Sequence, residues 1–241
     1  MTILEKIYKN NKQKALDDIL ELYKKKGYGV INYIYFANLI KCGILSGKNI
    51  DTNYFKSLKE CDFLLPDGIA LKMYYEKYFK LKLHNLNGTD FGEFLISSLK
   101  PKDINLILYG AKEEVIEKTI IYLKDKYNLD VFYAQNGYSD FDFEKLKNLD
   151  KDKINIFLLG LGTPKQEKWA LGHIEYLKKY KLLTFSQGGT FDFWAGEEKR
   201  APKIIQDLKL EWMFRFILNP RKNFYKVVNS FYVFYYLYFK K

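Results

Sequence analysis

A carboxylate held between a proline and a glycine is the first group in this sequence whose type and position could do chemistry. Asp67 stands between Pro66 and Gly68, directly after a short apolar run. Because proline fixes φ and glycine frees the next turn, we expect the Asp67 carboxylate at a defined place on a strand end, where it can take a proton from an attacking hydroxyl. An ordinary Pro-Asp-Gly turn has the same sequence, so both interpretations stay open at this point.

Gln166 follows a glycine turn at the end of the apolar run 154–159, which predicts a buried strand. Gly162 lets the backbone turn tightly and approach a ligand closely. Thr163 and Pro164 then predict a helix start, in which Gln166 occupies the capping-box position. Backbone N–H groups at such a helix end attract anions, which favours a phosphate site. The alternative is that Gln166 serves only as a cap.

Asp192 follows a second apolar run, residues 182–187, which breaks at Gly188. The break places Asp192 near the same edge of the sheet, where it could accept a hydrogen bond from a ribose or sugar hydroxyl; a turn or N-cap aspartate is the alternative. A third run, residues 104–109, ends at Gly110 and leads into a helical pattern. With the strand before the Pro-Asp-Gly segment, these runs predict four strand ends that form one crevice.

Together these blocks resemble a known family, the WecG/TagA/CpsF glycosyltransferases of bacterial cell-surface polymer synthesis. The most specific block begins Gly-Gly-Thr-Phe-Asp and continues through Lys-Arg-Ala-Pro and Leu-Glu-Trp. The blocks that carry the resemblance are LLPDGIAL (64–71), NGTDF (87–91), LYGAK (108–112), NGYSD (136–140), GLGTPKQEKW (160–169) and the segment 188–222.

The resemblance implies a metal-independent, inverting transfer of a sugar from a UDP-sugar to a hydroxyl of a polyprenyl-diphosphate-linked sugar, with no cofactor. The donor it implies is of the N-acetylmannosamine type. The family's proposed base falls on Asp67. The implied nucleotide-sugar contacts fall on Asn32, Asp90, Gly110, Gly162, Gln166, Gly188 and Asp192.

Two departures from the family pattern leave the donor sugar open. The family usually has a Thr-Pro-Asn segment after its first strand, where residues 31–38 of this chain offer only Asn32 as a stand-in. Many members also carry an arginine just before the Gly-x-Asp block, where residues 84–87 read His-Asn-Leu-Asn. A UDP-glucose or other UDP-hexose transferase of capsule or lipopolysaccharide assembly is therefore an alternative. A non-catalytic envelope-complex protein and a nucleic-acid-binding protein are the others.

The few arginines lie close together near the C-terminus. The net charge is +11, yet only Arg200, Arg215 and Arg221 are arginines and the other basic residues are lysines. A guanidinium is the better bidentate partner for a diphosphate, so we expect one or more of them to hold the acceptor or leaving diphosphate. Chance clustering or helix packing is the alternative. Nucleic acid is not expected as a partner, because the lysines are spread along the chain.

The segment from residue 211 onward mixes many aromatic and basic residues, which suits the headgroup boundary of a membrane. Its uncharged run, residues 227–239, is shorter than the about 20 residues needed to span a bilayer. We therefore expect the segment to lie on a membrane surface, and the resemblance implies the inner face of the cytoplasmic membrane. Packing on the chain's own domain, or on a second subunit in a homo-oligomer, is the alternative.

The sequence as a whole predicts an α/β fold, a single open Rossmann-like sheet flanked by helices. Residues 1–199 are expected to form the core and residues 200–241 a helical, membrane-docking appendage. The two cysteines and two histidines form no close ligand pair, so no metal site is expected. Asp140 and Asp142 spell Asp-x-Asp, which we interpret as a turn or cap. The lack of an export signal and the unpaired cysteines predict the cytoplasm.

Overall fold

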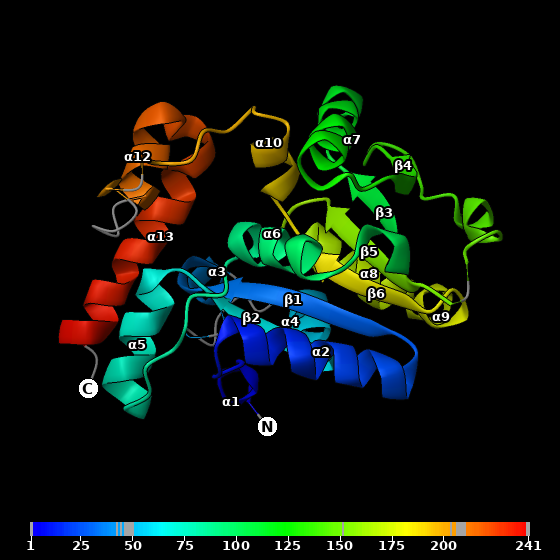
Figure 1. Ribbon diagram of the computed structural model, residues 1–241. Helices are drawn as coiled ribbons and strands as arrows, with labels where there is room; N and C mark the ends of the chain where they lie inside the picture. The colour runs from blue at the N-terminus through cyan, green and yellow to red at the C-terminus, as the bar shows by residue number, and fades with distance from the viewer. Residues whose placement is uncertain are drawn as a thin grey trace.

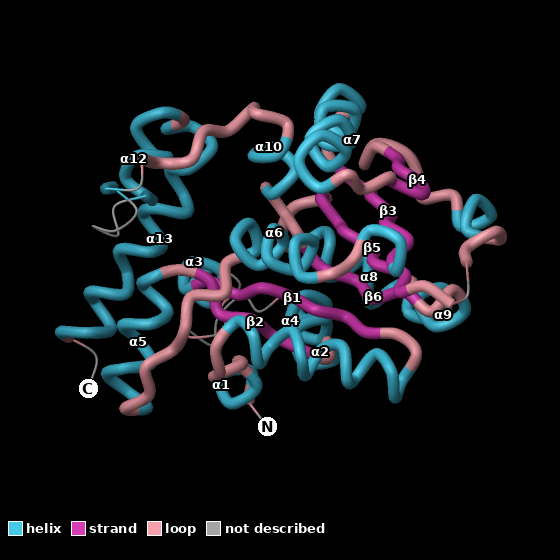
Figure 2. The backbone as a smooth tube through the Cα atoms, viewed as in Figure 1, coloured by secondary structure: helices cyan, strands magenta, loops and turns pink. Residues whose placement is uncertain are grey.

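One open sheet of six parallel strands forms the centre of the molecule, in the order β2-β1-β6-β5-β3-β4 (Figures 1 and 2). The computed structural model describes residues 2–41, 43, 45, 51–150, 152–202, 204–205 and 211–239. The sheet confirms the predicted Rossmann-like α/β class. Its strands are β1 (Gly29–Tyr35), β2 (Phe63–Asp67), β3 (Ile104–Gly110), β4 (Val131–Gln135), β5 (Ile154–Gly160) and β6 (Leu182–Ser186).

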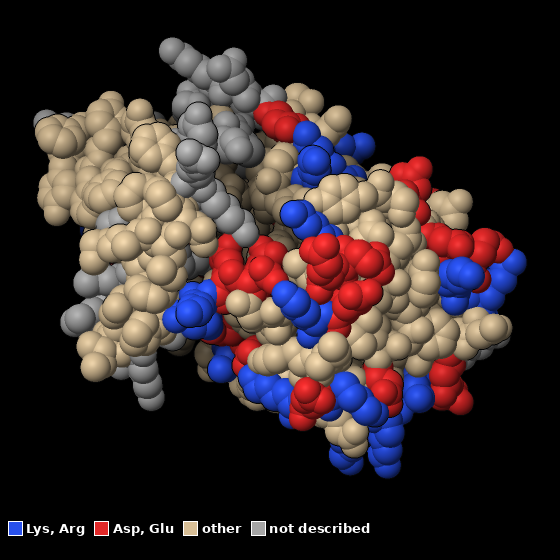
Figure 3. Space-filling view, turned by 90° about the horizontal axis from the view of Figure 1, so that it is seen from above, with Lys and Arg blue, Asp and Glu red and all other residues tan. Residues whose placement is uncertain are grey.

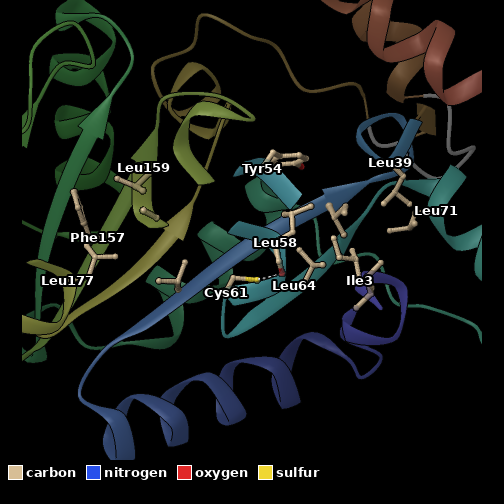
Figure 4. Close-up of a cluster of buried hydrophobic side chains, with 14 of the residues drawn as sticks. Ile3, Leu39, Tyr54, Leu58, Cys61, Leu64, Leu71, Phe157, Leu159 and Leu177 are labelled. Atoms are coloured by element: carbon tan, nitrogen blue, oxygen red, sulfur yellow. Dashed lines mark hydrogen bonds between the residues drawn. The ribbon is translucent and has the colours of Figure 1, made fainter. Parts of the chain in front are cut away.

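Helices cover both faces of the sheet, as in a doubly wound fold. On one face lie α1 (Ile3–Lys6), α3 (Phe36–Lys41), α4 (Thr52–Glu60), α5 (Ile69–Phe79), α8 (Lys165–Gly172), α9 (Ile174–Lys179) and α13 (Pro220–Tyr238), around the cluster of buried side chains in Figure 4. On the other face lie α2 (Lys12–Lys26), α6 (Gly88–Ser98), α7 (Glu113–Tyr127) and α10 (Thr190–Trp194). Helix α12 (Glu211–Leu218) and the 3₁₀ turns η1 (Pro101–Asp103) and η2 (Phe143–Leu146) complete the elements.

The alternation of side chains along β1 decides which of its residues can reach the end of the sheet. Val30 and Ile34 pack in the cluster on the α4 face, whereas Ile31 and Tyr33 pack on the α6 face. Asn32, between them, therefore points to the α4 side. There its Oδ1 accepts a hydrogen bond from Ser186 Oγ at 2.7 Å.

The ends of β3 and β5 approach so closely that only glycine fits. Gly110 has φ +131°, and a Cβ placed on it would lie 2.4 Å from the carbonyl carbon of Gly160. The two glycines are directly paired in the parallel register. Backbone in this conformation disfavours any side chain, so Gly110 brings the two strand ends together.

Helix α13 packs against α3 and α5 and buries Val233 and Tyr236 in the cluster on that face of the sheet (Figure 1). The ammonium of Lys77 on α5 donates to the carbonyl oxygens of Tyr236, at 3.0 Å, and Leu237, so the C-terminal end of α13 is capped by a cation. The boundary expected at residue 200 stays a prediction. Among the described helices, none combines the length and apolar character needed to cross a membrane.

Candidate active site

A pocket of about 440 Å³ opens at the carboxyl ends of β1, β2, β5 and β6. This is where open α/β sheets bind ligands. It brings together Asp67, Gln166 and Asp192, which lie far apart in the sequence. The other lining residues are Tyr33, Tyr35, Gly88, Thr89, Ala111, Gly160, Leu161, Gly162, Thr163, Ser186, Gln187, Gly188, Gly189, Thr190, Phe193 and Glu198.

Asp67 is the last residue of β2 and pairs in register with Tyr35 of β1. The chain that follows α5 returns to hold this strand end. The Gly68 N–H donates to Asn85 Oδ1 at 2.9 Å, and the carbonyl oxygen of Pro66 accepts from the Leu86 N–H at 2.8 Å. The backbone groups of both neighbours of Asp67 are thus hydrogen-bonded, which fixes Asp67 at the wall of the pocket.

Gln166 joins the two glycine turns of the pocket. Its Oε1 accepts a hydrogen bond from the Gly188 N–H at 3.0 Å. The expected capping box is wrong, because α8 starts only at Lys165, with Pro164 in the cap position. The hydroxyl of Thr163 instead donates to Glu167 Oε1 at 2.8 Å, so it does not cap a backbone N–H.

Three pocket residues that sequence analysis missed form a buried hydrogen-bonded chain. Gln187 Nε2 donates to the phenol oxygen of Tyr33 at 3.3 Å, and the Thr190 hydroxyl donates to Gln187 Oε1 at 2.8 Å. Gly88 and Gly92 on α6 leave room for this amide, because a Cβ on either would lie 3.1–3.3 Å from it. The signal available in the sequence was the Gln-Gly-Gly-Thr run itself, whose polar ends could have been assigned to the crevice.

The charge that lines the pocket is negative. Asp67, Asp192 and Glu198 line it, and its lining includes no lysine or arginine among the described residues. Burial, and next to it the charge of Asp67, raises the pKa of Tyr33, so the phenol stays protonated. A ligand with a diphosphate therefore needs backbone N–H groups, or cations from beyond this lining, as partners.

Of the remaining predicted nucleotide-sugar residues, two line the pocket and three do not. Gly162 and Gly188 line it, with φ +77° and +44°. Asn32 is fully buried behind it on the α4 face, and Gly110 serves the contact between β3 and β5. Asp90, in the first turn of α6, forms an ion pair with Arg200 and is not among the lining residues.

Of the three arginines, Arg200 is the one whose side chain the structure describes. Besides its ion pair with Asp90, its guanidinium lies 5.5 Å from the ring centroid of the pocket residue Phe193. Arg215 and Arg221 fall within α12 and α13, and their side chains lie outside the described residues. Their assignment to the diphosphate stays a prediction.

Asp142 of the Asp-x-Asp segment is a cap. Its side chain accepts a hydrogen bond from the Glu144 N–H at 3.0 Å at the start of η2. Asp140 contributes its carbonyl oxygen to Gln135, and neither aspartate lines the pocket. In the part of the chain that the structure describes, no group of three histidine, cysteine or acidic side chains is arranged to hold a metal ion.

A doubly wound sheet with a polar pocket at its carboxyl edge defines the class of α/β proteins that bind nucleotides and related ligands there. The chain matches the sequence model of the glycosyl transferase WecG/TagA/CpsF family over residues 2–241, and so belongs to that family. This confirms the family resemblance, and with it the expected glycosyltransferase class.

One relative has a named activity. The N-acetylglucosaminyldiphosphoundecaprenol N-acetyl-beta-D-mannosaminyltransferase of Bacillus subtilis (strain 168) is 30% identical to this chain over 171 residues. The alignment covers 70% of this chain and 66% of the relative, just under two thirds of that protein's length.

Proposed function

We propose that this protein transfers a sugar of the N-acetylmannosamine type from a UDP-sugar to a polyprenyl-diphosphate-linked acceptor sugar. The observation that carries the proposal is the pocket that gathers Asp67, Gln166 and Asp192 at one edge of the sheet. The name of the Bacillus subtilis relative supports the choice of sugar and of a lipid-diphosphate acceptor.

Asp67 acts as the general base in this proposal. It deprotonates the acceptor hydroxyl as that hydroxyl attacks the anomeric carbon in line, on the side opposite the leaving UDP, which inverts the configuration. The fixed position of Asp67 supports this role, because the chain on both sides of it is hydrogen-bonded to residues 85 and 86. Tyr33 and Tyr35 line the same pocket.

The donor nucleotide lies along the other strand ends, against Gln166, Asp192 and the glycine turns. Asp192 accepts from a ribose or sugar hydroxyl, as a carboxylate on the wall of a pocket does. The arginines after residue 199 bind the leaving diphosphate and stabilise its negative charge. Arg200 supports this part of the proposal, since its guanidinium contacts Phe193 at the pocket wall.

A different UDP-hexose is the second candidate donor. The observation that favours it is the wall at the end of β1, where Tyr33 and Tyr35 line the pocket and Asn32 does not. Two phenol rings make this wall bulky, so they influence which sugar fits the pocket. A panel of UDP-sugars distinguishes the two candidates.

The helices at the C-terminus dock the protein on the inner face of the cytoplasmic membrane in this proposal. On α13 the residues Phe231, Phe234, Tyr235 and Tyr238 form an exposed aromatic stripe, on the side opposite the buried Val233 and Tyr236. The side of the molecule with α12 and α13 lies at the left in Figure 3. Exposed aromatic rings on a helix suit the headgroup boundary of a membrane. A second copy of the chain is the other partner that such a stripe fits.

The experiment that tests the proposed function is UDP release, measured with a series of UDP-sugars and a short-chain prenyl-diphosphate N-acetylglucosamine acceptor. Release that depends on the acceptor, with one donor preferred, is the expected result. Wild-type protein that binds neither UDP nor any UDP-sugar would contradict the proposal.

A further inference from the structure

Glu167 is a buried carboxyl that contacts two side chains of the pocket without lining the pocket itself. It is 1% exposed. Its Oε1 lies 2.8 Å from Thr163 Oγ1 and 3.1 Å from Gln166 Nε2. Its Oε2 is buried and has no hydrogen-bond partner among the described residues. Burying a carboxyl with one unpaired oxygen costs stability, so the residue calls for a role beyond packing.

The direction of every hydrogen bond around Glu167 follows from one backbone group. The Gly188 N–H can only donate, so the Gln166 atom 3.0 Å from it is the acceptor Oε1. The other end of that amide is then Nε2, which can only donate, so Glu167 Oε1 accepts and carries no proton. The Thr163 hydroxyl must therefore be the donor in its own bond to Glu167 Oε1.

The consequence for the pocket concerns the polarity of Thr163. A threonine hydroxyl has one proton and two lone pairs, and the proton of Thr163 is used on Glu167. One of the two lone pairs accepts a long hydrogen bond from Gln166 Nε2 at 3.5 Å. Thr163 lines the pocket, so it presents the other lone pair to a ligand. Phosphate oxygens are acceptors and cannot pair with that lone pair, whereas a ligand hydroxyl or N–H can.

We propose that Glu167 is a positioning residue, which holds Thr163 as a hydrogen-bond acceptor so that this wall of the pocket binds a hydroxyl or N–H of the nucleotide sugar and not its diphosphate. The proposal rests on the UDP-sugar function proposed above. It replaces the expectation from sequence that the start of α8 holds the phosphates. The ion pair of Lys168 on α8 supports this, because an ammonium that is paired with Asp51 is not committed to a phosphate.

Calorimetric binding to the full chain tests the proposal, with UDP, 2′-deoxy-UDP, 3′-deoxy-UDP, N3-methyl-UDP and UDP-N-acetylglucosamine as probes. Thr163→Val keeps the shape of the side chain and removes the acceptor. Glu167→Met removes the group that orients Thr163, and Glu167→Gln keeps an oxygen in its place. Thr184→Val is the matched control, because Thr184 is buried in β6, does not line the pocket, and its hydroxyl has no hydrogen-bond partner among the described residues.

Thr163→Val is expected to weaken binding about 5- to 10-fold, the worth of one hydrogen bond, for the probes that retain the partner group. If the partner group is on the nucleotide, Thr163→Val should cause no loss of affinity for the one analogue that lacks this group. If the partner group is on the sugar, the loss of affinity should appear only with UDP-N-acetylglucosamine. Glu167→Met should weaken binding in the same pattern, while Glu167→Gln and Thr184→Val bind as tightly as the wild type.

Two results overturn the proposal while leaving the proposed function in place. One is Thr163→Val protein that binds all five probes as tightly as the wild type. The other is a loss of equal size for every probe, because the partner of Thr163 would then be none of the varied donor groups. Should Glu167→Met fail to fold, the Thr163→Val series decides alone. Wild-type protein that binds no probe overturns both proposals together.

Discussion

The buried carboxyl of Glu167 makes the stability of this protein depend on pH in a way that one substitution should remove. Burial raises the pKa of Glu167 from 4.5 to about 7, a rise that its bonds to Thr163 and Gln166 only partly oppose. The folded protein therefore binds a proton at this site more tightly than the unfolded chain does. Glu167→Gln keeps the shape of the side chain and cannot ionise.

The size of the effect follows from the two pKa values. Each pKa unit corresponds to 1.36 kcal/mol, so ionised Glu167 lowers the free energy of unfolding by about 3 kcal/mol at most. Because the folded pKa is the higher one, the favourable contribution is complete below pH 4.5 and is lost as the pH rises through 7. Between pH 5 and pH 8 the loss amounts to about 2 to 3 kcal/mol.

Urea unfolding of wild-type and Glu167→Gln protein at pH 5, 6, 7 and 8 measures this difference. The variant should gain stability over the wild type by about 2 to 3 kcal/mol across that range, and the gain should level off above pH 7. Glu175→Gln is the matched control, because that carboxylate on α9 is 78% exposed, and its difference from the wild type should stay small at every pH. If the free energies of unfolding of wild type and Glu167→Gln change with pH by the same amount, the assignment of a buried acid with a raised pKa at this position is refuted.

Four further outcomes are expected. Asp67→Asn should lower kcat by at least about 100-fold with UDP affinity unchanged, since it removes the proton acceptor; wild-type turnover would exclude Asp67 as the base. Activity should persist in EDTA, and loss that Mg²⁺ or Mn²⁺ restores would return attention to the Asp-x-Asp segment. The pair Tyr235→Glu and Tyr238→Glu, at side chains 53% and 74% exposed, should abolish flotation with anionic vesicles, while Ile121→Glu on α7 should not; vesicle binding by the double variant would refute docking by α13. Gly110→Ala places a Cβ 2.4 Å from the backbone of β5 and should cost more than about 3 kcal/mol of stability; a wild-type urea midpoint would contradict that close approach.

Buried parallel strands were predictable because their sequences are continuous apolar runs. The runs at residues 104–109, 154–159 and 182–187 correspond to β3, β5 and β6, and their glycines end them where expected. The edge strand β4 was missed, since Val131–Gln135 is only partly buried and its register to β3 shifts by an irregularity. The other edge strand, β2, has a buried apolar run and was predicted, whereas β4 carries too little of the hydrophobic pattern to stand out.

Residues at or shortly after a strand end could be assigned to the pocket from sequence, whereas the face that a residue within a strand occupies could not. Asp67, Gln166 and Asp192 line the pocket, and each lies at or shortly after such an end; their roles stay predictions. Asn32 was chosen by its position in a stretch that lacks the family's usual residues, but the period of two along β1 turns it toward α4 and turns Tyr33 toward the pocket.

Hydrogen-bond partners across the sheet could not be inferred from spacing at all. The Thr-Pro-Lys-Gln sequence fits a capping box locally, yet Thr163 bonds to Glu167, and Gln166 bonds to the Gly188 N–H 22 residues away. Local capping competes with tertiary partners that only the assembled sheet brings close. The role of Glu167 emerged for the same reason, since nothing in the sequence marks it as buried.

We propose that Asp67 and the pocket around it catalyse transfer of a sugar from UDP to a lipid-linked acceptor. UDP release by wild-type and Asp67→Asn protein tests this, measured in EDTA across a panel of UDP-sugars, with and without a prenyl-diphosphate N-acetylglucosamine acceptor. We expect acceptor-dependent release by the wild type with one preferred donor, and almost none by the variant that still binds UDP. Equal release by both proteins, or no release from any donor by a wild-type protein supplied with acceptor and membrane, would contradict it.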